Sequence, residues 1–297
     1  MALATAVVIS LVGCSRSPQG AGGKISVVAS FFPIYEAARR VGGGRVQVTN
    51  LTPTGAEPHD LELSPKHVDE ILDARVVLYM GLGFQPAVEE TVRERGDGIT
   101  TDLLAALSSQ LRKLQGEGAL PGGADPHVWL DPVLMADLVL EVRDALTRAD
   151  PAGGAIYLRN ADAYRSEVVG LDGRFRSGLH DCARRVIVTS HAAFGYLASR
   201  YGLRQEAISG LSPEAEPDPK RLAQLTDLVR RERVTTIFTE ELVSPSVANT
   251  LAREAGVRTA VLNPLEGLTA EEIARGEGYV SVMEQNLRTL RAALGCR

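Results

Sequence analysis

Three histidines stand out because each lies in its own distinctive loop sequence. They are His59 in Gly-Ala-Glu-Pro-His-Asp (residues 55–60), His127 in Asp-Pro-His-Val-Trp-Leu-Asp-Pro (125–132) and His191 in Thr-Ser-His-Ala-Ala-Phe (189–194). The three lie 68 and 64 residues apart in a 297-residue chain with only five histidines, so only the fold can bring them together. Neutral imidazole is the commonest side-chain metal ligand, and three imidazoles suit a tetrahedral zinc site. We therefore expect these histidines to bind a metal ion.

The elements that must position these histidines follow from the hydrophobic pattern. Short apolar runs predict strands at residues 25–30, 46–51, 75–80, 185–189, 204–209, 235–239 and 258–262. Segments of helical periodicity lie between and after them, at residues 33–41, 65–74, 103–114, 132–148, 192–201, 220–231, 247–255 and 279–294. Alternation of strands and helices predicts an α/β fold with parallel sheets flanked by helices.

One long helix is expected to join two α/β lobes. A continuous apolar stripe at intervals of three and four residues runs from Tyr157 to Leu179, which predicts about 24 helical residues, or roughly 36 Å. The predicted organisation has four parts: residues 1–23 as a lipoprotein signal and tether, 24–153 as the first lobe, 154–180 as the linking helix and 181–297 as the second lobe.

The histidines fall where a parallel sheet binds ligands, outside the carboxyl ends of its strands. His191 follows a predicted strand directly, and Glu240 and Asn263 do so in the same lobe. His59 lies in the loop after the strand at 46–51, and His127 lies in the loop that opens the helix at 132–148. We expect all of them to face one cleft between the lobes.

The N-terminus resembles a bacterial lipoprotein signal. Residues 1–13 are uncharged and mostly aliphatic, and they lead into Leu-Val-Gly-Cys at residues 11–14 and a polar, glycine-rich stretch at 15–23. Lipidation of Cys14 would hold an extracytoplasmic protein at the cell membrane. The alternative is a buried N-terminal strand in which this cysteine is incidental.

The remaining cysteines, Cys182 and Cys296, are expected to form a disulfide, because exported proteins meet an oxidising environment. Metal binding by Cys182 together with His191 is disfavoured, since an intervening strand separates the two by about 20 Å. The net charge of −5 lacks the basic footprint of a nucleic-acid-binding protein.

A set of motifs in order along nearly the whole chain resembles the solute-binding proteins of bacterial zinc and manganese ABC importers. These motifs are at residues 31–35, 57–62, 80–84, 127–132, 189–191, 214–217, 238–240 and 262–265. The resemblance implies two lobes joined by a rigid helix, a metal ion held in the cleft, and delivery to a membrane permease powered by a cytoplasmic ATPase. It implies a monomeric binding protein rather than an enzyme.

The fourth ligand is less well defined by the sequence. The family's usual Asp in a Leu-Asp-Pro loop is replaced here by Asn263, a neutral and weaker donor. Glu240 can supply the missing charge, so we expect it to be the fourth ligand; Asn263 or water are the alternatives, as is a role for Glu240 as hydrogen-bond acceptor from a ligating imidazole. Glu57 is a less favoured candidate. Three imidazoles favour zinc over manganese, which prefers oxygen ligands.

Three other functions remain open at this point. Three histidines with an open fourth position also form catalytic zinc sites, so a zinc hydrolase is the main alternative of a different class. The sequence nevertheless contains no His-Glu-x-x-His helix and marks no carboxylate as a general base. Binding of manganese or iron on the same fold and a role as a surface adhesin are the further alternatives.

Overall fold

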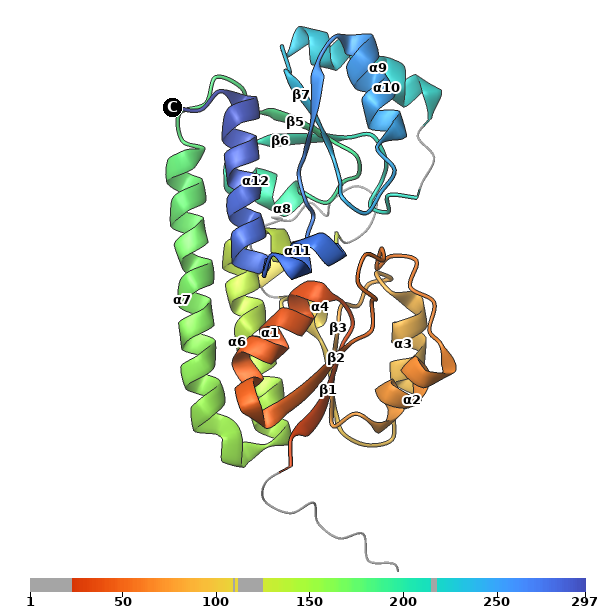
Figure 1. Ribbon diagram of the computed structural model, residues 1–297, viewed down its shortest axis with the longest axis vertical. Coiled ribbons are helices and arrows are strands. Elements are labelled where there is room, and N and C mark those ends of the chain that lie inside the picture. The colour runs from red at the N-terminus through yellow and green to blue at the C-terminus, as the bar shows by residue number, and fades with distance from the viewer. Residues whose placement is uncertain (1–22, 109, 112–124, 215–217) are drawn as a thin grey trace, which may run out of the picture.

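The computed structural model describes residues 23–108, 110–111, 125–214 and 218–297, and contains two parallel β-sheets of four strands each. Figure 1 shows the two sheets one above the other, with long helices running along one side of both. Strand order is β2-β1-β3-β4 in the first sheet and β6-β5-β7-β8 in the second, so the second half of the chain repeats the topology of the first. The expected fold class, two α/β lobes with a long helix beside them, is confirmed.

The strands of the first sheet alternate with helices along the chain. Its strands are β1 (Ile25–Ala29), β2 (Val46–Asn50), β3 (Val76–Tyr79) and β4 (Ile99–Asp102). Among the described residues of this half, the structure has α1 (Phe32–Gly42), α2 (Pro65–Asp73), α3 (Pro86–Arg93), α4 (Leu103–Ala106) and α6 (Pro132–Ala149). Short 3-10 turns lie at Gly43–Arg45 and Val128–Leu130. The inner strands β1 and β3 are mostly buried, as expected for strands covered on both faces.

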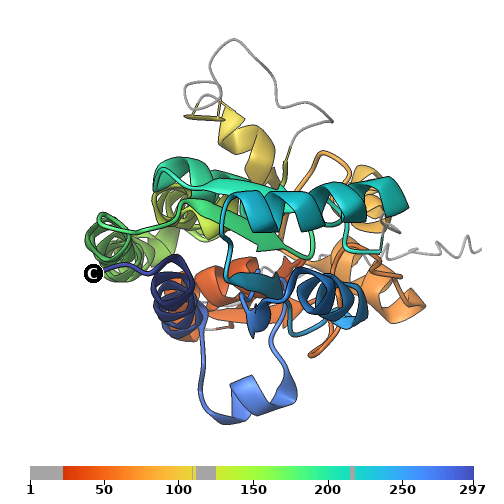
Figure 2. The same ribbon diagram turned by 90° about the horizontal axis from the view of Figure 1, so that it is seen from above.

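The second sheet is built in the same way. Its strands are β5 (Val186–Thr189), β6 (Arg204–Ala207), β7 (Thr236–Thr239) and β8 (Arg258–Val261). Its helices are α8 (Gly195–Arg200), α9 (Pro219–Arg231), α10 (Ser246–Ala255), α11 (Ala270–Ala274) and α12 (Tyr279–Leu294). In Figure 2 helix α12 lies beside α7, while α11 projects as a separate short segment.

Local sequence explains where several of these helices begin. Ser64 accepts a hydrogen bond from the backbone N–H of His67, and proline occupies the first position of α2. Asp131 caps α6 in the same manner through the N–H of Val133, again with proline at the first position. Each arrangement satisfies a free N–H group and uses proline where no intrahelical bond is lost.

Helix α7 (Gly154–Gly178) is the expected long connection. Its apolar stripe, from Tyr157 to Phe175, is buried, and the helix packs against α1 and α6 of the first half and against α12 of the second. Just beyond the carboxyl ends of α7 and α12, Cys182 and Cys296 form a disulfide, which confirms the predicted pairing. The pairing ties the chain entering the second sheet to the last turn of the protein.

Three elements were not predicted from the sequence: β4, α3 and α11. Strand β4 (Ile-Thr-Thr-Asp) contains a single aliphatic residue and therefore lacks an apolar run, and α11, with five residues, is too short for a clear helical period. The predicted lobe boundaries at residues 153 and 180 remain a prediction, and Cys14 and residues 112–124 lie outside the described residues. No helix in the described part of the chain has the length and apolar character needed to cross a membrane.

Candidate metal centre

Three imidazoles and one carboxylate meet where the two halves of the chain face each other. The side chains of His59, His127, His191 and Glu266 place one ligand atom each within 4.8 Å of all the others. His127 and His191 are fully buried, Glu266 is 1% exposed, and the His59 side chain is 9% exposed. The structure thus brings together all three histidines expected from the sequence.

The spacing of these atoms fits a tetrahedral zinc ion. Oε1 of Glu266 lies 3.3, 3.0 and 3.2 Å from Nε2 of His59, His127 and His191, respectively. The Nε2 atoms of His127 and His191 lie 3.3 Å apart. When four ligands bind zinc at about 2.0–2.1 Å, neighbouring ligand atoms lie about 3.3–3.4 Å apart. These four separations are therefore close to those of a four-coordinate zinc site.

His127 is held by the aspartate two residues before it. Oδ1 of Asp125 accepts hydrogen bonds from both the backbone N–H of His127, at 2.9 Å, and its Nδ1, at 2.7 Å. With Nδ1 as the donor, Nε2 keeps its lone pair, which faces the cluster. A carboxylate behind a ligating histidine is the usual device for setting its tautomer and orientation.

His191 is held in the same way from a neighbouring strand. It follows β5, and Glu240 follows β7, which pairs with β5 in the sheet. Both carboxylate oxygens of Glu240 lie 2.8 Å from Nδ1 of His191, and Oε1 also accepts from the His191 backbone N–H at 3.2 Å. This contact again directs Nε2 toward the cluster.

His59 belongs to the loop between β2 and α2. Its backbone N–H donates to Oε1 of Glu57 at 3.0 Å, and its ring packs edge-on against Phe84 with centroids 4.7 Å apart. Burial, together with the negative charge of Glu266, raises the pKa of Glu57 to about 9. A protonated Glu57 therefore supports the loop without adding to the negative charge of the carboxylates around the cluster.

Glu266 reaches the cluster through a tight turn after β8. The residue before it, Leu265, is fully buried and has a left-handed backbone (φ 60°), an uncommon conformation for a leucine. After it, Gly267 comes so close to the His59 loop that an added Cβ would lie 3.1 Å from the carbonyl oxygen of Ala56. The N–H of Gly55 also donates to the carbonyl of Leu268 at 3.0 Å.

The cluster carries opposing charges even without an ion. Burial by itself lowers the pKa of His191, but the charge of Glu266 and the hydrogen bond to Glu240 outweigh burial and raise that pKa well above its ordinary value. Burial likewise opposes protonation of His127, and its bonds to Asp125 and Glu266 raise its pKa. Burial would raise the pKa of Glu266, whereas the charge of His191 and the histidine contacts hold it well below the usual value. A cation entering the site therefore displaces protons.

Glu240, the predicted fourth ligand, and Asn263, one of its alternatives, lie elsewhere. Glu240 is behind His191, on the Nδ1 side, which matches the alternative role of hydrogen-bond acceptor. Asn263 is used within its own loop: its Oδ1 accepts from the N–H of Leu265 at 2.7 Å and its Nδ2 donates to Glu272 at 2.9 Å. Glu266 instead approaches all three Nε2 atoms, a position that sequence reasoning missed.

A signal for Glu266 was present but weak. It directly follows the segment 262–265, and it is a lone acidic residue between Pro264-Leu265 and Gly267-Leu268. An acidic side chain in such an apolar context is rarely buried without a partner. The left-handed turn at Leu265 could not be read from the sequence, and this turn decides where the carboxylate points.

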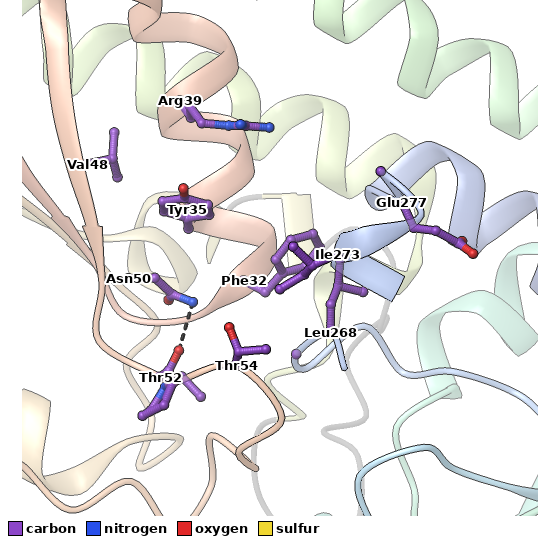
Figure 3. A pocket seen from close by; sticks show the side chains of 13 residues that line it. Phe32, Tyr35, Arg39, Val48, Asn50, Thr52, Thr54, Leu268, Ile273 and Glu277 are labelled. Atoms are coloured by element: carbon purple, nitrogen blue, oxygen red, sulfur yellow. Dashed lines mark hydrogen bonds between the residues drawn. The ribbon is translucent and has the colours of Figure 1, made fainter. Parts of the chain in front are cut away.

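A separate cavity of about 550 Å³ lies beside the cluster. In Figure 3 Tyr35 and Phe32 extend from α1, Ile273 overlaps Phe32 in the view, and Leu268, Thr54 and Thr52 lie below them. None of the four clustered residues lines it. The cavity therefore marks where the bases of the His59 and Glu266 loops meet and is distinct from the candidate metal centre.

Comparison with known proteins agrees with the fold and shows the family. Residues 27–293 match the family model described as zinc-uptake complex component A periplasmic. The zinc-binding lipoprotein AdcA of Streptococcus pneumoniae is 40% identical over 300 residues, covering 97% of this chain and 59% of that protein. The chain thus spans little more than half the length of that relative.

Two further relatives match over most of their length. The high-affinity zinc uptake system protein ZnuA of Bacillus subtilis is 35% identical over 287 residues, covering 94% of this chain and 90% of that protein. The crystal structure of the Zn(II)-bound ZnuA-like domain of S. pneumoniae AdcA superposes with a TM-score of 0.76 at 41% identity, covering 92% of this chain and 99% of that one. With a family match across nearly the whole chain, this protein belongs to the family of zinc-uptake complex component A proteins.

Proposed function

We propose that this protein captures a zinc ion outside the cytoplasm, using His59, His127, His191 and Glu266 as ligands, and delivers it to an ABC-type membrane permease. The observation that carries the proposal is the convergence of four buried ligand atoms at the separations of a tetrahedral site. The family match and the zinc-related names of the relatives support the transport role.

Ligand type supports zinc as the cargo. Three imidazole nitrogens and one carboxylate oxygen suit a borderline-soft ion such as zinc, whereas manganese prefers sites with more oxygen ligands. The single carboxylate leaves a net charge of +1 on the zinc centre, and Asp125 and Glu240 lie directly behind two of the imidazoles. The surroundings therefore neutralise the ion without further ligands.

The geometry argues against the hydrolase alternative. A catalytic zinc ion keeps one position open for water or substrate, while four protein ligands form a closed site. Here Glu266 occupies the position that a zinc-bound water would need, and the cluster is almost entirely buried. Capture and release of the ion fit this arrangement better than turnover of a substrate.

Anchoring belongs to the same proposal. We place the lipid on Cys14, which the signal-like segment at residues 1–13 precedes. One of the relatives is named a lipoprotein, which supports this placement. Mass spectrometry of membrane-extracted protein is expected to find a diacylglyceryl adduct on Cys14, and an unmodified N-terminus at Met1 would contradict the anchor.

Elemental analysis and competition titration test the zinc site. Purified protein is expected to hold one zinc per chain and to prefer zinc over manganese in the presence of a chelator. Alanine variants of His59, His127 and His191 are each expected to weaken zinc binding by at least about tenfold. Mutation of residues that only orient a metal ligand already lowers metal affinity by about that factor. His180, which lies outside the cluster, supplies the matched control (His180→Ala). Wild-type affinity in all three variants would overturn the ligand assignment.

A further inference from the structure

The carboxylate of Glu266 has little of its own to hold it in place. Its Oε1 faces the three imidazoles, and among the described residues its Oε2 is buried without a hydrogen-bond partner. Among the described residues, no hydrogen bond or ion pair outside the histidine cluster holds this side chain. Its position therefore depends on the backbone of residues 263–266, and on whatever fixes that backbone.

The backbone of this loop is bonded on two sides. Toward α12, Asn286 accepts from the N–H of Asn263 at 2.9 Å and donates to the Asn263 carbonyl at 2.7 Å. On the other side, the indole Nε1–H of Trp129 donates to the carbonyl of Pro264 at 2.8 Å. Trp129 and Pro264 lie 135 residues apart in the chain, and this bond links a segment of the first half to the loop that carries Glu266.

Trp129 also lies next to the histidines of the first half. It is two residues from His127, and the two ring centroids are 5.1 Å apart. Its ring packs against Phe84 at 5.4 Å, and Phe84 packs in turn against His59 at 4.7 Å. The indole is fully buried, and the Trp129 carbonyl accepts a 2.6 Å bond from the hydroxyl of Tyr279 at the start of α12.

We propose that Trp129 is a positioning residue that fixes the Glu266 carboxylate relative to His127 and thereby sets the affinity of the zinc site. The inference rests on the proposed zinc-binding function and adds a residue that contacts no metal. One aromatic side chain packs beside the imidazole of His127, and its single N–H group holds the carbonyl two residues before Glu266. A ligand site must be held to about 0.5 Å to keep its geometry, and such support comes from buried side chains of this kind.

The test separates the indole N–H from the bulk of the ring. Trp129→Phe removes the N–H donor and keeps an aromatic ring. The control variant is Phe31→Leu. It disturbs the same aromatic cluster, because the Phe31 and Trp129 ring centroids lie 4.6 Å apart, but it leaves the hydrogen bond from Trp129 to Pro264 in place. Trp129→Phe is expected to weaken zinc binding by about threefold to tenfold, the range of one net buried hydrogen bond. Phe31→Leu is expected to change zinc affinity less than Trp129→Phe does, even where it lowers the melting temperature as much.

A double-mutant cycle with Glu266→Gln tests the route of the effect. If Trp129 acts through Glu266, Trp129→Phe in the Glu266→Gln background changes zinc affinity by no more than about twofold, the scatter of independent sites. Cobalt-loaded protein gives a spectroscopic readout: the visible bands of Trp129→Phe are expected to shift toward those of Glu266→Gln. Equal losses of affinity in both backgrounds, with unchanged cobalt bands, would overturn the proposal.

A second replacement covers the case in which Trp129→Phe does not fold. Trp129 is the only tryptophan in the sequence, so biosynthetic replacement of tryptophan by benzothienylalanine, with sulfur in place of N–H, alters this position alone. The same loss of affinity is expected, and an affinity equal to wild type refutes the positioning role. One outcome would refute this inference and leave the proposed function intact. In that outcome, zinc affinity falls when any of the three histidines is replaced but stays at the wild-type value when the indole N–H is removed.

Discussion

Replacement of Glu266 by Gln removes the one charged ligand that we assign while keeping its size and a carbonyl oxygen. Its Oε1 lies 3.0–3.3 Å from all three Nε2 atoms, so its charge acts on any ion held between them. Loss of residues that only orient a ligand costs 10–100-fold in metal affinity. We therefore expect Glu266→Gln to weaken zinc binding by at least about 100-fold, or about 2.7 kcal/mol at 1.36 kcal/mol per factor of ten.

The loss should depend on pH in a defined direction. The charge of Glu266 helps to raise the pKa of His191 and of His127, so the variant has fewer protons for zinc to displace. At low pH, this weaker competition by protons partly offsets the zinc affinity that the variant loses with the charge of Glu266. The ratio of wild-type to variant affinity is therefore expected to be larger at pH 8 than at pH 6.

Competition against a chromophoric chelator at both pH values measures these affinities. The emission of Trp129 gives a second readout, because its ring lies 5.1 Å from that of His127. Glu240→Gln serves as the comparison, since Glu240 bonds to Nδ1 and the backbone N–H of His191 rather than to its Nε2, and a loss of about 10–100-fold is expected there. A larger loss in Glu240→Gln than in Glu266→Gln at pH 8 would refute our ligand assignment and restore Glu240 as the fourth ligand.

Three further predictions follow from the same contacts. Because the pKa of His127 is raised, protons should compete with zinc already at pH values above about 6.5, the ordinary pKa of an imidazole, and zinc affinity should fall as the pH decreases. Calorimetry in buffers of different ionisation enthalpy detects the protons released when zinc binds. Asn263→Asp should lower thermal stability without tightening zinc binding, because it places a carboxylate against Glu272, 2.9 Å away; tighter binding would show that the new carboxylate reaches the ion. Replacing Cys182 and Cys296 by Ser should lower the free energy of unfolding by about 2–5 kcal/mol in urea titrations, since the closed loop spans 114 residues, and a change below about 1 kcal/mol would contradict this.

The sequence by itself was sufficient to predict that the three histidines cluster and that an α/β fold brings them together. His191 follows the buried strand β5, His59 lies in the loop after β2, and His127 lies in the loop that leads into the capped helix α6. The strands and the helix start are local patterns of hydrophobic period and capping chemistry. Parallel strands end at one edge of a sheet, so residues after them converge whatever the details of packing. The long apolar stripe beginning at Tyr157 likewise defined α7 without tertiary information.

Only the tertiary structure decided which carboxylate faces the imidazoles. The sequence favoured Glu240, which directly follows a predicted strand, over Glu266, which lies four residues beyond the end of the predicted strand at 258–262. A left-handed turn at Leu265, the bond from Trp129 to Pro264 and the close approach of Gly267 to the His59 loop direct Glu266 inward. These contacts join residues far apart in the chain and depend on side-chain direction, whereas sequence periodicity reports which face of an element is buried but not where a loop carboxylate points.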